Sequence, residues 1–205
     1  MAQRLGLFGG TFDPIHFGHL AIAEAAREEL CLDRVWFVPA RLQPHKRSRR
    51  VTDAEHRWEM VRLALAGNPC FEPSRLELNR EGPSYTADTV AEVRRQAGPG
   101  QEIFFICGAD TLLELDSWYR PADLMAWATI AVARRPGCED TAVTRAAAQL
   151  EARFGGRVVL FEAPLLDVSS SLIRERLAAG RSIRYLVADG VREYIVRNCL
   201  YRKGI

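Results

Sequence analysis

Short apolar runs alternate along this chain with stretches of amphipathic helical pattern, and this alternation is the feature that most limits the fold. The apolar runs have the length and composition of buried strands. They predict strands over residues 4–8, 34–39, 71–78, 102–107, 129–133 and 158–162. The amphipathic stretches predict helices over residues 19–30, 53–66, 86–96 and 140–154.

This order of elements predicts an α/β fold with a Rossmann-like, doubly wound, largely parallel sheet covered by helices on both faces. Right-handed crossovers then place ligands at the carboxyl ends of the strands. Two further helices, over 169–179 and 189–200, have no clear strand between them. They predict a small C-terminal helical segment at about 165–205. A length of 205 residues suits a single domain over residues 1–205.

Charge and cysteine usage argue against several classes of protein. The net charge of +2 gives no reason to expect nucleic acid or an acidic membrane as a partner. The five cysteines are scattered without a CxxC pair, which argues against a disulfide framework or a structural zinc site. No apolar stretch approaches the roughly 20 residues of a membrane span, and no signal peptide is visible. We therefore expect a cytoplasmic protein, as a monomer or a homo-oligomer.

The first connection from strand to helix contains the sequence GGTFDPIHFGH, residues 9–19. The N–H groups and positive end of such a helix start bind anions, typically a phosphate. Gly10 and Gly18 allow a phosphate to approach the backbone without a Cβ in the way. His16 and His19 are three residues apart and can point the same way. The run therefore indicates phosphate chemistry.

The histidine pair has two simpler interpretations. A zinc site would need a third and usually a fourth ligand, but only His45 and His56 remain as histidines and the cysteines are unpaired in spacing. The two imidazoles could also only cap and pack at the helix start. We favour imidazoles that donate hydrogen bonds to phosphate oxygens, and the capping interpretation stays open.

A second helix start could form another anion cradle. Ser169, Ser170 and Ser171 offer three hydroxyls, which by themselves would satisfy free N–H groups as ordinary N-caps. Arg174 adds a guanidinium three residues after Ser171. Together with the first cradle, this arrangement describes a polyphosphate held from two sides.

Three other segments carry weaker signals. Lys46 lies in a basic loop after the second strand, where it could meet outer phosphates or only be solvated. Gly108 and Asp110 follow the fourth strand, where an Asp could bind ribose hydroxyls or cap the next helix. Trp118 and Tyr119 offer flat surface for a ring, although a core tryptophan is commoner.

Taken together, these residues closely resemble the nicotinate-nucleotide adenylyltransferase family, within the nucleotidyltransferase superfamily marked by HxGH motifs. The likeness rests on GGTFDPIHFGHL, PHK, SYTADT, GAD, WY, RRPG, VSSSLIR and VREYI, and it covers essentially the whole chain. One departure is Ser171, which stands where the family usually has threonine and keeps the hydroxyl.

The resemblance implies transfer of AMP from ATP to nicotinate mononucleotide, which gives deamido-NAD and pyrophosphate. It implies catalytic roles for His16, His19, Lys46 and Arg174. It implies ATP contacts from Gly9, Gly10, Thr11, Phe12, His16, His19, Gly108, Asp110, Ser170, Ser171 and Arg174. For nicotinate mononucleotide it implies contacts from Lys46, Thr86, Trp118, Tyr119 and Arg134.

The implied chemistry needs no protein base, because the 5′-phosphate of the acceptor is already anionic when it attacks the α-phosphorus of ATP. Catalysis would then be positioning and charge stabilisation. We expect Mg²⁺ held mainly by phosphates and water, without a metal site made of protein side chains.

Other functions stay open at this stage. The nearest are sister adenylyltransferases that use nicotinamide mononucleotide or phosphopantetheine. A non-catalytic nucleotide-binding sensor is an alternative from another class. A dehydrogenase is disfavoured, since no G-x-G-x-x-G follows the first strand.

His19→Ala should abolish turnover while the fold survives, because it removes one donor to the developing phosphate charge. Removal of such a donor typically lowers a rate by about 10²–10³. Initial rates and a circular dichroism spectrum of the variant provide the measurement. A variant that keeps more than about a tenth of the wild-type rate would contradict the role given to His19.

Overall fold

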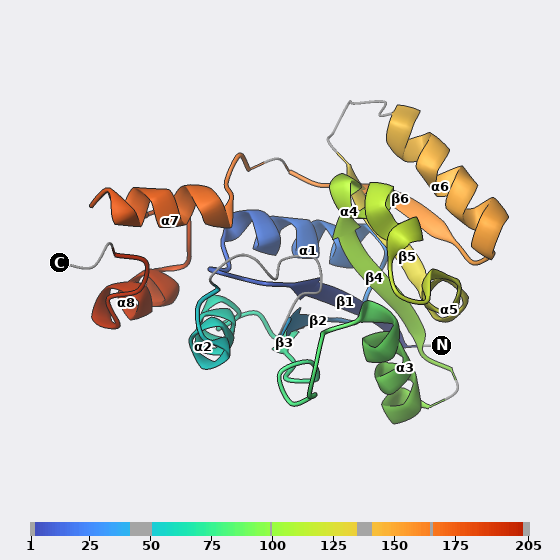
Figure 1. Ribbon diagram of the computed structural model, residues 1–205, viewed down its shortest axis with the longest axis horizontal. Helices are drawn as coiled ribbons and strands as arrows, with labels where there is room; N and C mark the ends of the chain where they lie inside the picture. Colours follow the sequence, from blue (N-terminus) through green and yellow to red (C-terminus); the bar gives the residue numbers. More distant parts are fainter. Residues whose placement is uncertain (1–2, 42–50, 99, 135–140, 165, 203–205) are drawn as a thin grey trace.

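The computed structural model describes residues 3–41, 51–98, 100–134, 141–164 and 166–202. Within these ranges a sheet of six strands lies between two layers of helices (Figure 1). The strands are β1 (Arg4–Gly10), β2 (Arg34–Pro39), β3 (Phe71–Pro73), β4 (Glu102–Gly108), β5 (Thr129–Arg134) and β6 (Val158–Glu162). The helices are α1 (Phe17–Glu29), α2 (Ala54–Ala64), α3 (Thr86–Ala97), α4 (Ala109–Glu114), the 3₁₀ helix η2 (Leu115–Ser117), α5 (Pro121–Trp127), α6 (Thr141–Phe154), α7 (Ser170–Ala178) and α8 (Asp189–Arg197).

The strands are hydrogen-bonded in the order β3-β2-β1-β4-β5-β6, and every neighbouring pair is parallel. The chain therefore winds outward from β1 in one direction and then from β4 in the other. This confirms the predicted Rossmann-like, doubly wound α/β fold. The order reverses between β1 and β4, and in such sheets ligands bind at that point, beyond the carboxyl ends of the strands.

Alternate residues of each strand supply two separate cores. Leu5 and Leu7 of β1 are buried against α3 to α6, whereas Phe8 is buried on the opposite face with α1, α2, α7 and α8. On β4, Phe105 and Ile106 divide in the same way. Both faces of the sheet are therefore buried, which explains why the strands read as continuous apolar runs.

Side chains cap the starts of helices α2 and α7. Asp53 caps α2, and its carboxylate accepts from the backbone N–H of Glu55 at 2.9 Å. Ser169 caps α7 by accepting from the N–H of Leu172 at 3.1 Å. Helix α1 begins at Phe17 with His16 as its N-cap, two residues before the predicted start.

The sequence prediction was wrong in two places. The strand predicted over 71–78 ends at Pro73, because residues 76–79 form a turn in which the N–H of Asn79 donates to the oxygen of Arg75. Helices α4, η2 and α5 were missed. They are six, three and seven residues long, too short to establish a helical period in the sequence.

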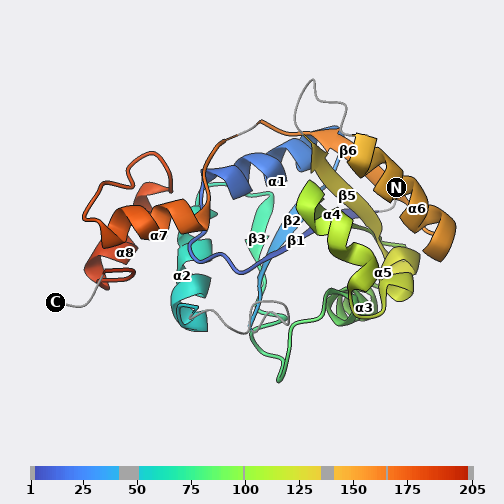
Figure 2. The same ribbon diagram turned by 45° about the horizontal axis from the view of Figure 1, so that its top comes forward.

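Helices α7 and α8 form the predicted C-terminal helical segment. They lie beside α2, at the end of the molecule opposite α6 (Figure 2). Ile173 of α7 and Val191 and Ile195 of α8 join the same core as α1. This packing brings the start of α7 next to the start of α1. In the part of the chain that the structure describes, no helix has the length and apolar character needed to span a bilayer.

Candidate active site

The connection from β1 to α1 forms the centre of the site. Phe12 has a φ of 50° and its side chain is buried, with its ring edge-on to His19 at 5.1 Å between centroids. A Cβ on Gly10 would come within 3.0 Å of the Phe12 ring, so a side chain there would have to displace that ring by a few tenths of an ångström. Phe12 therefore anchors the loop in the core, and only its backbone is available to a ligand.

His16 and His19 lie stacked, with ring centroids 3.7 Å apart and planes at 29°. The backbone N–H of His16 donates to Nδ1 of His19 at 3.2 Å. Because Nδ1 accepts, a neutral His19 carries its proton on Nε2, from which it can donate to a ligand. The structure thus brings the two predicted imidazoles together at the start of α1.

His16 is buried, and its Nδ1 has no hydrogen-bond partner among the described residues. Burial lowers the pKa of His16 from its ordinary 6.5 to about 4. The free protein therefore holds a neutral imidazole beside His19 at pH 7, which avoids repulsion between two stacked cations.

The start of α7 lies against the same loop. The hydroxyl of Ser170 donates to the backbone oxygen of Pro14 at 2.9 Å. The guanidinium of Arg174 donates from Nη1 to the backbone oxygen of Asp13 and from Nη2 to the Ser171 hydroxyl at 3.0 Å. The two predicted cradles are thus adjacent, and Arg174 is bonded to the first loop as well as to its own helix.

Two buried residues that support this loop were not recognised in the sequence. Asp13 is 5% exposed and Arg57 is 1% exposed. Arg57 donates from Nη1 to the backbone oxygen of Thr11 at 2.8 Å and from Nε to that of Thr52 at 2.9 Å. Burial lowers the pKa of Arg57, and the Asp13 carboxylate opposes this effect. The loop is therefore fixed by a guanidinium that lies beneath it.

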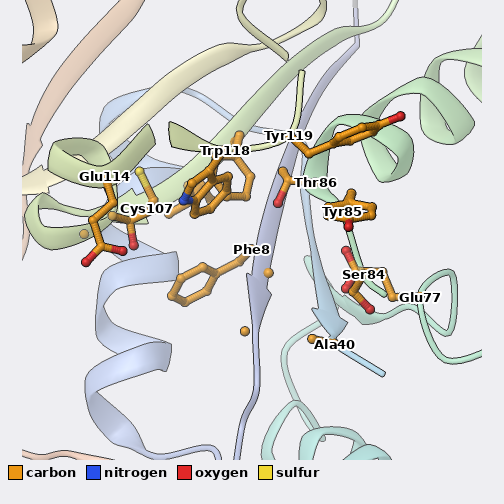
Figure 3. Close-up of a pocket in the computed structure, with 16 residues that line it drawn as sticks. Phe8, Ala40, Glu77, Ser84, Tyr85, Thr86, Cys107, Glu114, Trp118 and Tyr119 are labelled. Atoms are coloured by element: carbon orange, nitrogen blue, oxygen red, sulfur yellow. The ribbon is translucent and has the colours of Figure 1, made fainter. Parts of the chain in front are cut away.

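A cavity of about 240 Å³ opens beside this loop, at the carboxyl ends of β1 and β4 (Figure 3). Six predicted site residues line it: Gly9, Gly10, Thr86, Gly108, Trp118 and Tyr119. Its lining also includes residues that were not predicted, among them Phe8, Glu77, Ser84, Tyr85, Phe105, Thr111 and Glu114.

Aromatic rings surround much of the cavity. Trp118 packs edge-on against Phe105, with centroids 5.9 Å apart. Tyr85 and Tyr119 lie next to each other on one side of the cavity, with ring centroids 4.4 Å apart (Figure 3). Tyr119 is 49% exposed, so this pair forms the rim. The cavity can therefore hold a planar ring.

A buried carboxyl group lies at the edge of the cavity. Glu77 accepts from the Thr89 hydroxyl at 2.7 Å, and burial raises the pKa of Glu77. Thr89 lies in the first turns of α3, so Glu77 holds that helix start in place. Sequence reasoning could not find this contact, because Glu77 falls in the segment that was read as a strand.

Asp110 and Arg134 were also predicted as site residues, but neither lines the cavity. Asp110 is exposed in the first turn of α4. Arg134 ends β5 and pairs with Glu162 at 3.3 Å. Lys46 lies outside the described residues. Within the described ranges, no three His, Cys, Asp or Glu side chains come together as metal ligands.

The fold and this site define a nucleotidyltransferase, and comparison with known proteins agrees. Residues 7–176 match the family model described as cytidylyltransferase-like. The chain belongs to this family and, within it, to the nicotinate-nucleotide adenylyltransferases. A relative from Moorella thermoacetica, named as a probable nicotinate-nucleotide adenylyltransferase, is 47% identical over 199 residues, which cover 97% of this chain and 92% of the relative.

A second relative with the same name, from Thermomicrobium roseum, is 47% identical over 200 residues, covering 98% of this chain and 92% of the relative. A solved structure, nicotinic acid mononucleotide adenylyltransferase of Plasmodium falciparum complexed with APC, superposes with a TM-score of 0.76. It is 19% identical to this chain and covers 97% of each, so it supports the fold. The same enzyme complexed with NaAD superposes with a TM-score of 0.75.

The buried His16 should make the ligand-free protein sensitive to acid. Its folded pKa of about 4 lies below the ordinary 6.5, so the unfolded chain binds more protons between these values. Stability therefore rises with pH across that window and is lost as the pH falls. We expect His16 to account for about 2 kcal/mol of stability lost between pH 7 and pH 5.

Urea unfolding of the wild type and of His16→Gln at both pH values measures this contribution. The variant should lose about 2 kcal/mol less than the wild type over the same interval. An equal loss in both proteins would show that His16 is not held neutral by burial.

Proposed function

We propose that this protein transfers AMP from ATP to nicotinate mononucleotide and forms deamido-NAD and pyrophosphate. One observation carries the proposal: stacked imidazoles, a second helix start and an aromatic cavity meet at the point where the strand order reverses. The full-length similarity to nicotinate-nucleotide adenylyltransferases supports the same reaction.

The ATP phosphates would lie over the starts of α1 and α7. His16, His19 and Arg174 would act as catalytic donors to the phosphate oxygens, with the hydroxyls of Ser170 and Ser171. The backbone of Gly9, Gly10, Thr11 and Phe12 would face the nucleotide, and Gly108 and Asp110 would lie along its adenosine. Lys46 would assist from its loop.

The acceptor phosphate would attack the α-phosphorus of ATP in line with the departing pyrophosphate. The P–O bond to pyrophosphate breaks as the new P–O bond forms, and no proton must leave the nucleophile. The protein would therefore act by positioning and by electrostatic stabilisation. His19 is suited to this because Nδ1 is already engaged by the His16 backbone, which fixes the orientation of the ring.

Mg²⁺ would accompany ATP. The described residues present no cluster of carboxylates to enclose it, and Mg²⁺ commonly keeps several waters while it binds substrate phosphates. When bound, the ion would neutralise charge on the phosphate oxygens.

The nicotinate ring would occupy the cavity between Trp118 and Tyr119. Its carboxylate would lie at the start of α3, where the N–H of Thr86 is among the first four of the helix and has no partner within it. The positive end of a helix favours a carboxylate over an amide. This feature favours nicotinate over nicotinamide mononucleotide. Arg134 and Lys46 would contact the same mononucleotide.

We further propose that the chain acts as a single unit over residues 1–205, in the cytoplasm and without nucleic acid as a partner.

A pyrophosphate-release assay with ATP and either mononucleotide tests the function. We expect rapid release with nicotinate mononucleotide and at least about tenfold slower release with the amide. Binding of ATP with no pyrophosphate from either acceptor would instead indicate a sensor. Faster release with nicotinamide mononucleotide or phosphopantetheine would identify a sister transferase.

Thr86→Pro should selectively weaken nicotinate binding. Proline is tolerated at the first position of a helix, and the φ of −99° and ψ of 127° at Tyr85 suit a residue before proline. The variant removes one N–H without removing the helix. We expect KM for nicotinate mononucleotide to rise about tenfold or more, with KM for ATP near the wild-type value.

Thr86→Ala is the matched comparison, because it removes the hydroxyl and keeps the N–H. Its effect on the same KM should be smaller than that of proline. If both variants raise KM equally, the hydroxyl and not the backbone would be the binding group.

A further inference from the structure

The carboxylate of Asp13 is held by groups from distant parts of the chain. Asp13 lies three residues before His16, in the phosphate-binding loop, and is 5% exposed. Its Oδ1 accepts from the hydroxyl of Tyr201 at 2.7 Å. Its Oδ2 accepts from the backbone N–H of Thr52 at 3.5 Å and lies 3.9 Å from Nη1 of Arg174. Every part of this carboxylate therefore faces a donor.

Tyr201 follows α8, 188 residues after Asp13. Its hydroxyl also lies 3.9 Å from Sδ of Met60 on α2, so Tyr201 contacts both this helix and the loop. Burial and the neighbouring Asp13 carboxylate raise the pKa of Tyr201, so the hydroxyl stays protonated and donates. The bond thus joins the end of the chain to the β1–α1 connection.

The position of Asp13 decides the position of the rest of the loop. Its backbone oxygen is held by Arg174, and the next residue, Pro14, is held by Ser170. His16 follows as the N-cap of α1 and contacts His19 through both its backbone and its ring. If the Oδ1 bond is lost, a buried acceptor is left without its donor, and the loop can move to recover one.

We propose that Tyr201 is a positioning residue: its hydroxyl acts through Asp13 to hold His16 and His19 in register with the ATP phosphates. The proposal rests on the proposed function in so far as ATP is the ligand at this loop. It predicts that loss of the Tyr201 hydroxyl, which lies outside the cavity, lowers kcat/KM for ATP and leaves KM for nicotinate mononucleotide unchanged.

The test compares Tyr201→Phe with Tyr194→Phe. Both substitutions remove one hydroxyl and keep the ring, and both lie in the C-terminal segment. The hydroxyl of Tyr194 bonds to Nδ1 of His56 at 2.9 Å and does not touch the loop. We expect Tyr201→Phe to lower kcat/KM for ATP about tenfold, with KM for nicotinate mononucleotide unchanged, and Tyr194→Phe to keep both near wild type.

Asp13→Ala, which removes the acceptor of the Tyr201 hydroxyl, and the double variant Asp13→Ala/Tyr201→Phe show whether Tyr201 acts through Asp13. If it does, the second substitution adds little to the first, whereas fully additive effects on kcat/KM would overturn the proposal. Melting temperatures of all variants identify any that lose the fold. The proposal is also overturned if Tyr201→Phe stays within about twofold of wild type, or if Tyr194→Phe is equally impaired.

Calorimetric titration with ATP separates this proposal from the proposed function. If the wild type binds ATP but releases no pyrophosphate, the proposed function fails while the comparison of ATP affinities still tests Tyr201. Weaker ATP binding by Tyr201→Phe than by Tyr194→Phe would support the positioning role. Equal affinities together with equal kcat/KM would refute it.

Discussion

A buried charge in the connection between β1 and α1 determines the geometry of the candidate phosphate site. The Asp13 carboxylate and the Arg57 guanidinium are both almost fully excluded from water. Breaking a buried ionic arrangement by removing one partner typically costs about 3–5 kcal/mol, so these groups accept few alternative positions. Glycine at position 10 allows the loop to adopt its conformation, but the side chains around Asp13 hold the loop in that conformation. They come from α2, from α7 and from beyond α8, so the loop depends on the whole C-terminal segment.

The two parts of the candidate site belong to opposite faces of the parallel sheet, and they come together at the carboxyl ends of the strands. Helices α1 and α7 belong to one core, and their starts form the two candidate phosphate cradles. Helices α3 and α5 belong to the other core, and the segments before them line the cavity. Strands β1 and β4 separate the two cores and supply the glycines at the junction. In the proposed reaction, ATP and the acceptor therefore reach the junction from different layers of the fold.

The sequence predicted the parts of this architecture that depend on local pattern. The six strands and the longer helices follow from buried apolar runs and amphipathic periodicity, although β3 ends at Pro73, five residues before the predicted end. Helices α4, η2 and α5 could not be predicted, because their positions depend on packing against β4 and α6 more than on a period. In the candidate site, the HxGH motif predicted the roles of His16 and His19 from the sequence. The partners of Asp13 depend on contacts between residues up to 188 positions apart, such as Tyr201, and no local pattern reveals them.

The neutral state of His16 follows from the same packing. It also affects how strongly an anion beside His16 would be bound. Two stacked imidazolium ions with centroids 3.7 Å apart would repel each other, so burial of His16 allows both rings to remain in place in the absence of a ligand. A phosphate oxygen beside His16 favours the protonated form, because an opposite charge stabilises the cation. Protonation of His16 and binding of an anion therefore stabilise each other. In the proposed reaction, the site would gain positive charge as the substrate supplies the compensating negative charge, and the ligand-free protein does not have to stabilise a buried cation.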